Sequence, residues 1–147
     1  MKKNLWISML LLFAGVTAGH AKTMSIAKDE VNVRSKPSKQ SQVLYKATRG
    51  YPVLAKKRQH HWLYVEDWHG RKGWVYAKLV SSIPTTVVKV DMANVRKGPS
   101  QKNASIAKAK QGEIYKVLAS RNNWVKIGYY FENEPAGWIH EDLVWGY

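Results

Sequence analysis

The sequence predicts an all-β protein, with two small β-barrels in tandem behind a helical signal peptide. Three observations support this prediction: the chain repeats itself, its apolar residues fall in short strand-like runs, and no window carries a long amphipathic helical stripe. The length of 147 residues suits one ordinary domain or two small ones. Hydrophobic residues make up 45% and aromatic residues 12% of the chain, which is enough to exclude wholesale disorder.

The repeat divides the chain. A shift of 62 residues (94 − 32) aligns the two copies, with two residues inserted in the second. Fourteen of the 52 positions from Asp29 to Val80 are identical and keep their order. The shared runs are Asn-Val-Arg at 32–34 and 94–96, Pro-Ser at 37–38 and 99–100, and Gly-Trp at 73–74 and 137–138. We interpret this pattern as a duplication, which gives a signal peptide at 1–21, a first domain at 22–81, a linker at 82–88 and a second domain at 89–147.

Each copy reads as a series of short strands. Runs of aromatic and β-branched residues are broken by Gly, Pro and Asn, which is typical of strands joined by turns. The expected strands are 42–47, 53–57, 62–65 and 73–76 in the first copy, and 106–109, 114–119, 124–127 and 138–139 in the second. In the linker, Pro84 limits bending and favours a fixed tandem.

The first 21 residues have the three-part plan of a secretory signal. A basic start at Lys2 and Lys3 precedes an apolar run over residues 5–16, and small residues at Gly19 and Ala21 mark a cut after Ala21. The alternative is a retained membrane anchor, but the run is shorter than the roughly 18–20 residues that span a bilayer. The cut predicts a periplasmic or secreted protein without a transmembrane segment, with a net charge of +12 (14 − 2).

Composition excludes several functional classes. The chain has no cysteine, which excludes disulfide scaffolds, thiolate zinc sites, iron–sulfur clusters and cysteine nucleophiles. The 24 Lys and Arg residues against 10 Asp and Glu give a net charge of +14, which predicts an anionic partner. Nucleic acid fits this charge but not the export signal, so it is not the expected partner. The charge gathers on the first copy, with +7 over residues 29–80 (11 − 4) against +2 over residues 91–147 (8 − 6).

The ordered motifs resemble a known family. Asn-Val-Arg-x-x-Pro-Ser, a later Gly, a Trp that opens a central strand, and Gly-Trp-Val/Ile before a closing Leu-Val are similar to the bacterial SH3 (SH3b) domain. The resemblance implies SH3-like barrels of five or six short antiparallel strands. It also implies binding modules of exported and cell-wall proteins, which commonly recognise peptidoglycan or its peptides. Many such modules accompany a catalytic domain, but here only short flanks surround the two copies, so binding without attached chemistry is expected. The alternative is a periplasmic adaptor that binds another envelope protein.

Residues present in both copies are interpreted as parts of the shared scaffold. An Arg can satisfy several buried carbonyl groups, and an Asn can close a local side-chain-to-backbone bond. Glycines suit positions where a Cβ would interfere, whereas a Trp serves either as core or as a ligand platform. The scaffold set is Asn32, Arg34, Gly50, Trp62, Gly73 and Trp74 in the first copy, and Asn94, Arg96, Gly112, Trp124, Gly137 and Trp138 in the second.

Residues that the copies do not share are candidates for ligand binding. In the first copy, aromatic residues interleave with basic ones, which suits stacking on sugar faces or peptides while attracting negative charge. The alternative is a solvated basic face with packed tyrosines. The candidates are Tyr45, Tyr51, Lys57, Tyr64, Trp68, Arg71 and Tyr76, with Tyr129 and Tyr130 beside the insertion as a separate aromatic group.

Enzyme chemistry is not expected from this inventory. No Gly-x-Ser-x-Gly motif accompanies the histidines. The paired acids Glu66 and Asp67 look like solvated turn residues rather than one shielded and one ionised carboxyl group. His60 and His61 are adjacent, and adjacent strand residues point to opposite faces, which disfavours a metal site. No catalytic residue, cofactor or metal is therefore predicted.

Overall fold

The computed structural model describes residues 21–132 and 134–147. The expected signal peptide therefore lies outside the described residues, apart from Ala21. Within the described part of the chain, no helix has the length and apolar character needed to cross a membrane. Nearly all regular structure is β, which confirms the predicted fold class.

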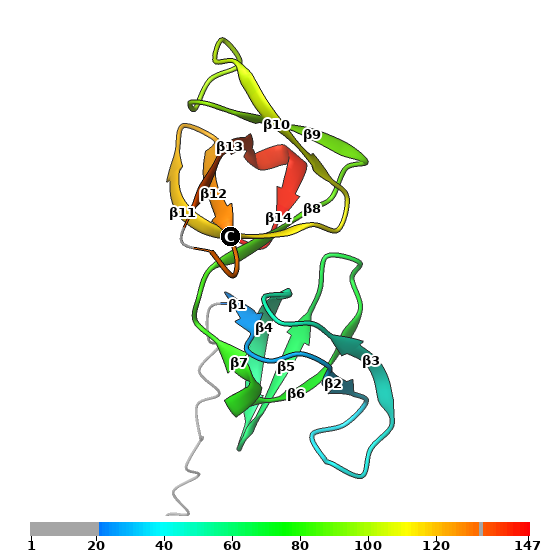
Figure 1. Cartoon of the computed structure of the whole chain (residues 1–147). Helices are drawn as coiled ribbons and strands as arrows, with labels where there is room; N and C mark the ends of the chain where they lie inside the picture. Colours follow the sequence, from blue (N-terminus) through cyan, green and yellow to red (C-terminus); the bar gives the residue numbers. More distant parts are fainter. Residues whose placement is uncertain (1–20, 133) are drawn as a thin grey trace, which may run out of the picture.

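Two seven-stranded antiparallel sheets, each curled into a small barrel, form the fold (Figure 1). Barrel 1 contains β1 (Lys22–Ile26), β2 (Val31–Arg34), β3 (Val43–Ala47), β4 (Pro52–Gln59), β5 (Trp62–Glu66), β6 (Lys72–Tyr76), the 3-10 turn η1 (Ala77–Leu79) and β7 (Val80–Ser81). Barrel 2 contains β8 (Thr85–Val88), β9 (Met92–Arg96), β10 (Ser105–Lys110), β11 (Ile114–Arg121), β12 (Trp124–Tyr129), β13 (Pro135–His140), the 3-10 turn η2 (Glu141–Leu143) and β14 (Val144–Trp145). The strands expected from sequence all occur, with shifted ends.

The duplication extends to the sheet topology. The strand order in barrel 1 is β3-β2-β6-β5-β4-β1-β7, and in barrel 2 it is β10-β9-β13-β12-β11-β8-β14. Each strand of barrel 2 therefore has the same place in its sheet as the barrel 1 strand whose number is lower by seven, so that β8 corresponds to β1 and β14 to β7. Register follows the same rule, since Ser25 pairs with Pro52 in barrel 1 and Val87 pairs with Ile114 in barrel 2.

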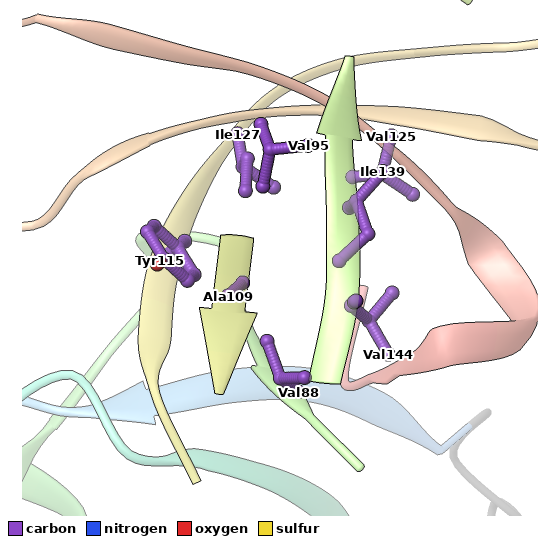
Figure 2. Packing of buried hydrophobic residues seen from close by; sticks show 9 residues of the cluster. Val88, Val95, Ala109, Tyr115, Val125, Ile127, Ile139 and Val144 are labelled. Carbon is purple, nitrogen blue, oxygen red and sulfur yellow. The ribbon is translucent and has the colours of Figure 1, made fainter. Parts of the chain in front are cut away.

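Each barrel has its own apolar core. Alternate residues of a strand point to opposite faces, so Val65 and Val75 point inward and are fully buried. In barrel 2 the same inward positions hold Ile127 and Ile139, also fully buried, and Figure 2 shows the side chains of this cluster converging between the strands. Without disulfides, this burial is the main source of stability, at about 1.5–3 kcal/mol for each fully buried aliphatic side chain.

The expected linker at 82–88 differs from the structure. Thr85–Val88 is strand β8, whose four residues are all buried, and it pairs with both β11 and β14 inside barrel 2. The strand has the role that β1 has in barrel 1. Only residues 82–84 connect the barrels as non-strand chain. The β-branched residues of the Thr-Thr-Val-Val run favour a strand, but the preceding Ser-Ser-Ile-Pro segment is typical of a linker, so the whole stretch was interpreted as one.

Polar contacts tie the barrels together around this strand. The hydroxyl of Thr85 donates to the carbonyl of Gly50 in barrel 1 at 2.7 Å, and both residues are buried. The hydroxyl of Ser25 in β1 donates to the carbonyl of Ile83 at 2.8 Å. The tandem is therefore held by side-chain hydrogen bonds as well as by a short connection.

Candidate ligand-binding surface

Four aromatic rings line the outer face of β5 and β6 in barrel 1. Because Leu63, Val65 and Val75 face the core, the alternate side chains of these strands point outward. Trp62 lies opposite Tyr76, with ring centroids 5.6 Å apart, and Tyr64 lies opposite Trp74, with centroids 5.1 Å apart. We call this set, Trp62, Tyr64, Trp74 and Tyr76, the aromatic ladder.

Lysines lie over the aromatic ladder. The Lys57 ammonium is 4.8 Å from the ring centroid of Tyr64 and 5.4 Å from that of Trp74. The Lys39 ammonium is 5.7 Å from the ring centroid of Tyr76. Each such contact contributes about 0.5–1 kcal/mol at an exposed site, so the positive charges are held on the ladder rather than free in solvent. The ladder thus combines flat apolar faces with cations.

An open groove of about 380 Å³ begins at one end of the ladder. Trp62 and Tyr76 form one wall, and Lys39 projects from the loop that follows β2. Arg34 holds this loop, since its guanidinium donates to the carbonyl of Ser41 at 2.7 Å. The remaining lining residues are Lys28, Asp29, Glu30, Val31, Asn32, Arg34 and Leu79. The groove therefore offers both signs of charge beside two aromatic rings.

The repeated Arg and Asn residues have different surroundings. Arg96 donates to the carbonyl of Asn103 at 2.9 Å, which is the counterpart of the Arg34 contact, so both arginines bind a loop carbonyl. Asn94 accepts hydrogen bonds from the Ser105 hydroxyl and the Lys108 ammonium. The buried Oδ1 atom of Asn32, by contrast, has no hydrogen-bond partner among the described residues. The two asparagines are therefore not equivalent.

The repeated glycines and tryptophans mostly serve packing. A Cβ at Gly73 would lie 2.9 Å from the carbonyl oxygen of Arg34, and one at Gly137 would lie 2.7 Å from that of Arg96. Trp74 and Trp124 are each only 8% exposed. Trp62 and Trp138 are half-buried and keep part of each ring accessible. From the sequence alone, each tryptophan could be either a core residue or a ligand platform. The exposed fractions assign Trp74 and Trp124 to the buried group and Trp62 and Trp138 to the accessible group.

Three of the candidate residues belong to a network around one buried carboxylate. The Asp67 side chain is fully buried and accepts from the hydroxyl of Tyr51 at 2.9 Å and from Arg71 Nε at 2.8 Å. It also accepts from the backbone amides of His69 and Arg71. The Arg71 guanidinium lies over the Tyr45 ring, 3.9 Å from its centroid. This network closes the β5–β6 turn, so Tyr45, Tyr51 and Arg71 have internal partners.

The expectation that Asp67 is a solvated turn acid was wrong. Its burial is compensated by an ion pair and by backbone amides, which is the usual requirement for a buried charge. The Asp-x-x-Gly pattern at 67–70 carried the signal, because an Asp side chain often accepts from amides two and more residues ahead. Burial raises the pKa of Tyr51 to about 12, and the hydrogen bond to Asp67 adds to this shift. Burial also raises the pKa of Tyr45, assisted by the charge of Asp67.

Trp68 lies apart from the ladder. It is half-buried in the β5–β6 turn and stacks against His69, with ring centroids 3.8 Å apart. Of the first-copy candidates, the structure therefore brings together Lys57, Tyr64 and Tyr76, and adds Trp62 and Trp74 from the scaffold set. Sequence reasoning treated these two tryptophans as scaffold because both copies carry them.

Barrel 2 lacks a full ladder. The positions of Tyr64 and Tyr76 are taken by Lys126 and His140, which pair with Trp138 and Trp124 across β12 and β13. The His140 ring meets Trp124 edge-on, with centroids 5.1 Å apart. The four-ring surface is therefore a property of barrel 1. Of the second-copy candidates, Tyr129 is the last residue of β12, and Tyr130 follows it in the β12–β13 loop, where its ring lies against Gly50 of barrel 1.

Comparisons with known proteins agree with the duplication. The family model described as bacterial SH3 domain matches twice, at residues 27–82 and 89–146. A curated relative from Bacillus subtilis (strain 168), named "Putative N-acetylmuramoyl-L-alanine amidase YrvJ", is 30% identical over 145 residues. The match covers 90% of this chain and 27% of that relative, so the chain spans about a quarter of its length.

Two solved structures from Trichomonas vaginalis also match, NlpC1 and NlpC2. NlpC1 is 17% identical, with 94% of this chain and 50% of that chain covered, and NlpC2 is 16% identical, with 86% and 48% covered. The TM-score is 0.37 in both cases, so these matches add nothing to the family match. Both family-model segments begin after the first strand of their barrel, since β1 ends at Ile26 and β8 ends at Val88.

Proposed function

Because this chain belongs to the bacterial SH3 domain family, we propose that it is an exported, non-catalytic protein that binds cell-wall peptidoglycan through the aromatic ladder of barrel 1. The relative from Bacillus subtilis carries the name of an amidase that acts on a muramoyl linkage, and it shares the tandem region at 30% identity. A shared wall ligand, without shared catalysis, is the simplest account of that similarity.

The four-ring ladder is the observation that carries the proposal. Aromatic faces stack on the apolar faces of sugar rings, and Trp62, Tyr64 and Tyr76 present partly exposed rings beside the buried ring of Trp74. Lys57 and Lys39 lie over these rings and attract carboxylates, which the stem peptides of peptidoglycan supply. The adjoining groove adds Asp29 and Glu30, which suit the amine and amide donors of the same peptides.

The proposed export implies a ligand in the envelope. Cleavage after Ala21 would release a chain that starts at Lys22, the first residue of β1. All four β1–β4 register pairs, from Lys22–Ala55 to Ser25–Pro52, would survive that cut. The proposed cleavage is therefore compatible with a complete barrel 1, and it would release the protein into the periplasm or outside the cell.

Sedimentation with purified peptidoglycan across a salt series tests the proposal. We expect the Tyr64→Ala, Tyr76→Ala double variant to lose about 10-fold or more in affinity, since each stacked ring contributes about 0.5–1.5 kcal/mol. The matched control is the Lys126→Ala, His140→Ala double variant, which changes the same two positions of barrel 2 and should bind like the wild type. Both variants must retain the wild-type melting temperature within a few degrees.

Two results would overturn this proposal. Binding that disappears in modest salt for wild type and variants alike would mean that net charge alone is responsible. No binding to peptidoglycan, together with specific recovery of one envelope protein from crosslinked cells, would favour the adaptor function instead.

A further inference from the structure

The two-residue insertion of the second copy lies at the junction of the barrels. It falls in the β12–β13 loop, which follows Tyr129, the last residue of β12, and carries Tyr130 and Phe131. The Tyr130 ring packs against Gly50 of barrel 1, where an added Cβ would lie 2.9 Å from Tyr130 Cδ2. The equivalent turn of barrel 1 is closed on itself by Asp67. The β5–β6 turn of barrel 1 thus makes its contacts within its own barrel, whereas the equivalent β12–β13 loop of barrel 2 reaches across to barrel 1.

The paired glycines show that this contact is specific to the junction. Gly50 and Gly112 occupy the same turn in the two copies, with φ of +81° and +85°. A Cβ on Gly112 would meet nothing within 4 Å, whereas one on Gly50 would meet Tyr130. Both positions need glycine for backbone reasons, but only Gly50 is covered by the other barrel.

A second groove of about 350 Å³ opens beside this contact. Barrel 1 contributes Thr48 and Arg49 to its lining. From barrel 2 come Gly112, Ile114, Tyr129, Tyr130, Phe131 and Glu132. Phe131 is 76% exposed and Tyr129 is 44% exposed, although both are large and apolar. These two rings therefore offer apolar faces to a ligand at the groove.

One ion pair connects this groove to the first. Asp29 lines the first groove and Arg49 lines the second. The Arg49 guanidinium lies 3.5 Å from the Asp29 carboxylate, which also accepts from the Arg49 amide at 3.2 Å and the Thr48 hydroxyl at 3.3 Å. The walls of the two grooves are therefore joined through Asp29 and Arg49.

The chemistry of the second groove favours sugar rings. Arg49 is already paired with Asp29, and its guanidinium lies 5.9 Å from the Phe131 ring centroid. Lys116 lies 5.5 Å from the Tyr130 ring centroid, and the groove lining holds one acidic residue, Glu132, against one basic residue, Arg49. The groove thus combines exposed aromatic faces with little net charge, which suits a saccharide better than a charged peptide.

We infer that the inter-barrel groove, with Phe131 and Tyr129, is a second subsite for the glycan strand of the wall polymer, so that one extended saccharide contacts both grooves across a fixed junction. The inference rests on the proposed function, because it takes the same polymer as the ligand. In this inference, the two-residue insertion of the second copy contributes to ligand binding, a contribution that the shorter turn of barrel 1 does not make.

Binding of purified, peptide-free glycan strands of short and long length tests this inference. We expect wild type to bind long strands about 3- to 10-fold more tightly than short ones, and Phe131→Ala to remove this difference without weakening short-strand binding. Gly50→Ala should do the same by displacing Tyr130, whereas Gly70→Ala, with similar backbone strain and free space in the β5–β6 turn outside both grooves, should keep the difference. Because Phe131 is so exposed, its variant should melt like wild type.

The outcomes separate this inference from the proposed function. If the ladder variant loses peptidoglycan while Phe131→Ala binds long strands like wild type, the second subsite is refuted and the proposed function stands. Dimerisation that Phe131→Ala abolishes would assign the loop to self-association and also refute the subsite. If wild type binds no peptidoglycan, both proposals fail together.

Discussion

Asp67 is fully buried beneath Arg71, whose Nε and Nη2 atoms lie 2.8 Å and 2.7 Å from its Oδ2 atom. The burial would be costly for an isolated carboxylate, but here two backbone amides and a tyrosine hydroxyl complete its hydrogen bonds. Desolvation acts to lower the pKa of Arg71, but hydrogen bonds to Asp67 and Tyr51, together with the charge of Asp67, outweigh it and raise this pKa. This pair organises the β5–β6 turn next to the aromatic ladder.

Replacing Asp67 should therefore destabilise the protein. Asp67→Asn removes the charge under Arg71 and leaves amide and guanidinium donors without a full set of acceptors. We expect a loss of about 2 kcal/mol in the free energy of unfolding, measured by urea titration. Glu30→Gln is the control, because its ion pair with Lys46 is exposed and should contribute less than about 0.5 kcal/mol. Equal effects of the two changes would contradict the special role of Asp67.

Alkaline pH should weaken the fold through Tyr51. Its pKa rises from 10.0 to about 12 on folding, first through burial and then through the hydrogen bond to Asp67. The unfolded chain therefore releases this proton first, so stability is complete below about pH 10 and falls between about pH 10 and pH 12. Thermal melts of wild type and Tyr51→Phe across this range should converge as pH rises. A difference in melting temperature between wild type and Tyr51→Phe that stays constant with pH would contradict the raised pKa of Tyr51, because the other tyrosines are the same in both proteins.

The tryptophans should separate into core and surface. Trp74→Ala removes a ring that is 8% exposed and should cost about 3–5 kcal/mol. Trp68→Ala removes a half-buried ring that stacks on His69, and should cost about 1 kcal/mol. Urea unfolding of both variants measures the contrast. A large loss for Trp68 would place it in the core instead.

The junction hydrogen bond should be visible by hydrogen exchange. Thr85→Val removes the donor to the buried carbonyl of Gly50, at an expected cost of about 1–2 kcal/mol. Exchange should then accelerate at the amides of residues 48–51 in barrel 1. Thr86→Val is the matched control, since its hydroxyl donates to Trp145 within barrel 2. Acceleration in barrel 1 after the control change would mean that the effect is global.

Secretion should produce one defined N-terminus. N-terminal sequencing of the exported chain should begin at Lys22, the β1 residue that pairs with Ala55. Alanine at position 21 can be changed to a large residue to block the cut, and the chain should then accumulate in the membrane fraction. An exported chain that begins at Met1 would contradict the signal peptide.

Much of this protein could be predicted from the repeat. The two copies share short local motifs, and each motif acts through contacts within its own barrel, such as Arg34 with Ser41 and Arg96 with Asn103. Such contacts span only a few residues, so the spacing alone was informative. The ladder residues Tyr64 and Tyr76 were also identified as candidates, because the second copy lacks them and they interleave with basic residues.

The rest depended on contacts between distant residues. Tyr45, Tyr51 and Arg71 looked like a surface set in the sequence, yet the fold brings them around the buried Asp67. Strand β8 looked like a linker, because its partners β11 and β14 are far away in the chain. The burial of a residue depends on which segments pack against it. When those segments are distant in the chain, the local sequence pattern does not predict the burial.

The sequence by itself determined the two-barrel architecture, the family resemblance and the basic, aromatic character of the first copy, because these follow from local periodicity and repeated spacing. Only the tertiary structure decided which aromatics form one surface, which serve as scaffold, and where the second copy meets the first. Gly50 and Gly112 illustrate the reason, since they have nearly the same φ and the same motif, but only Gly50 lies under Tyr130. That difference arises from the packing of one barrel on the other.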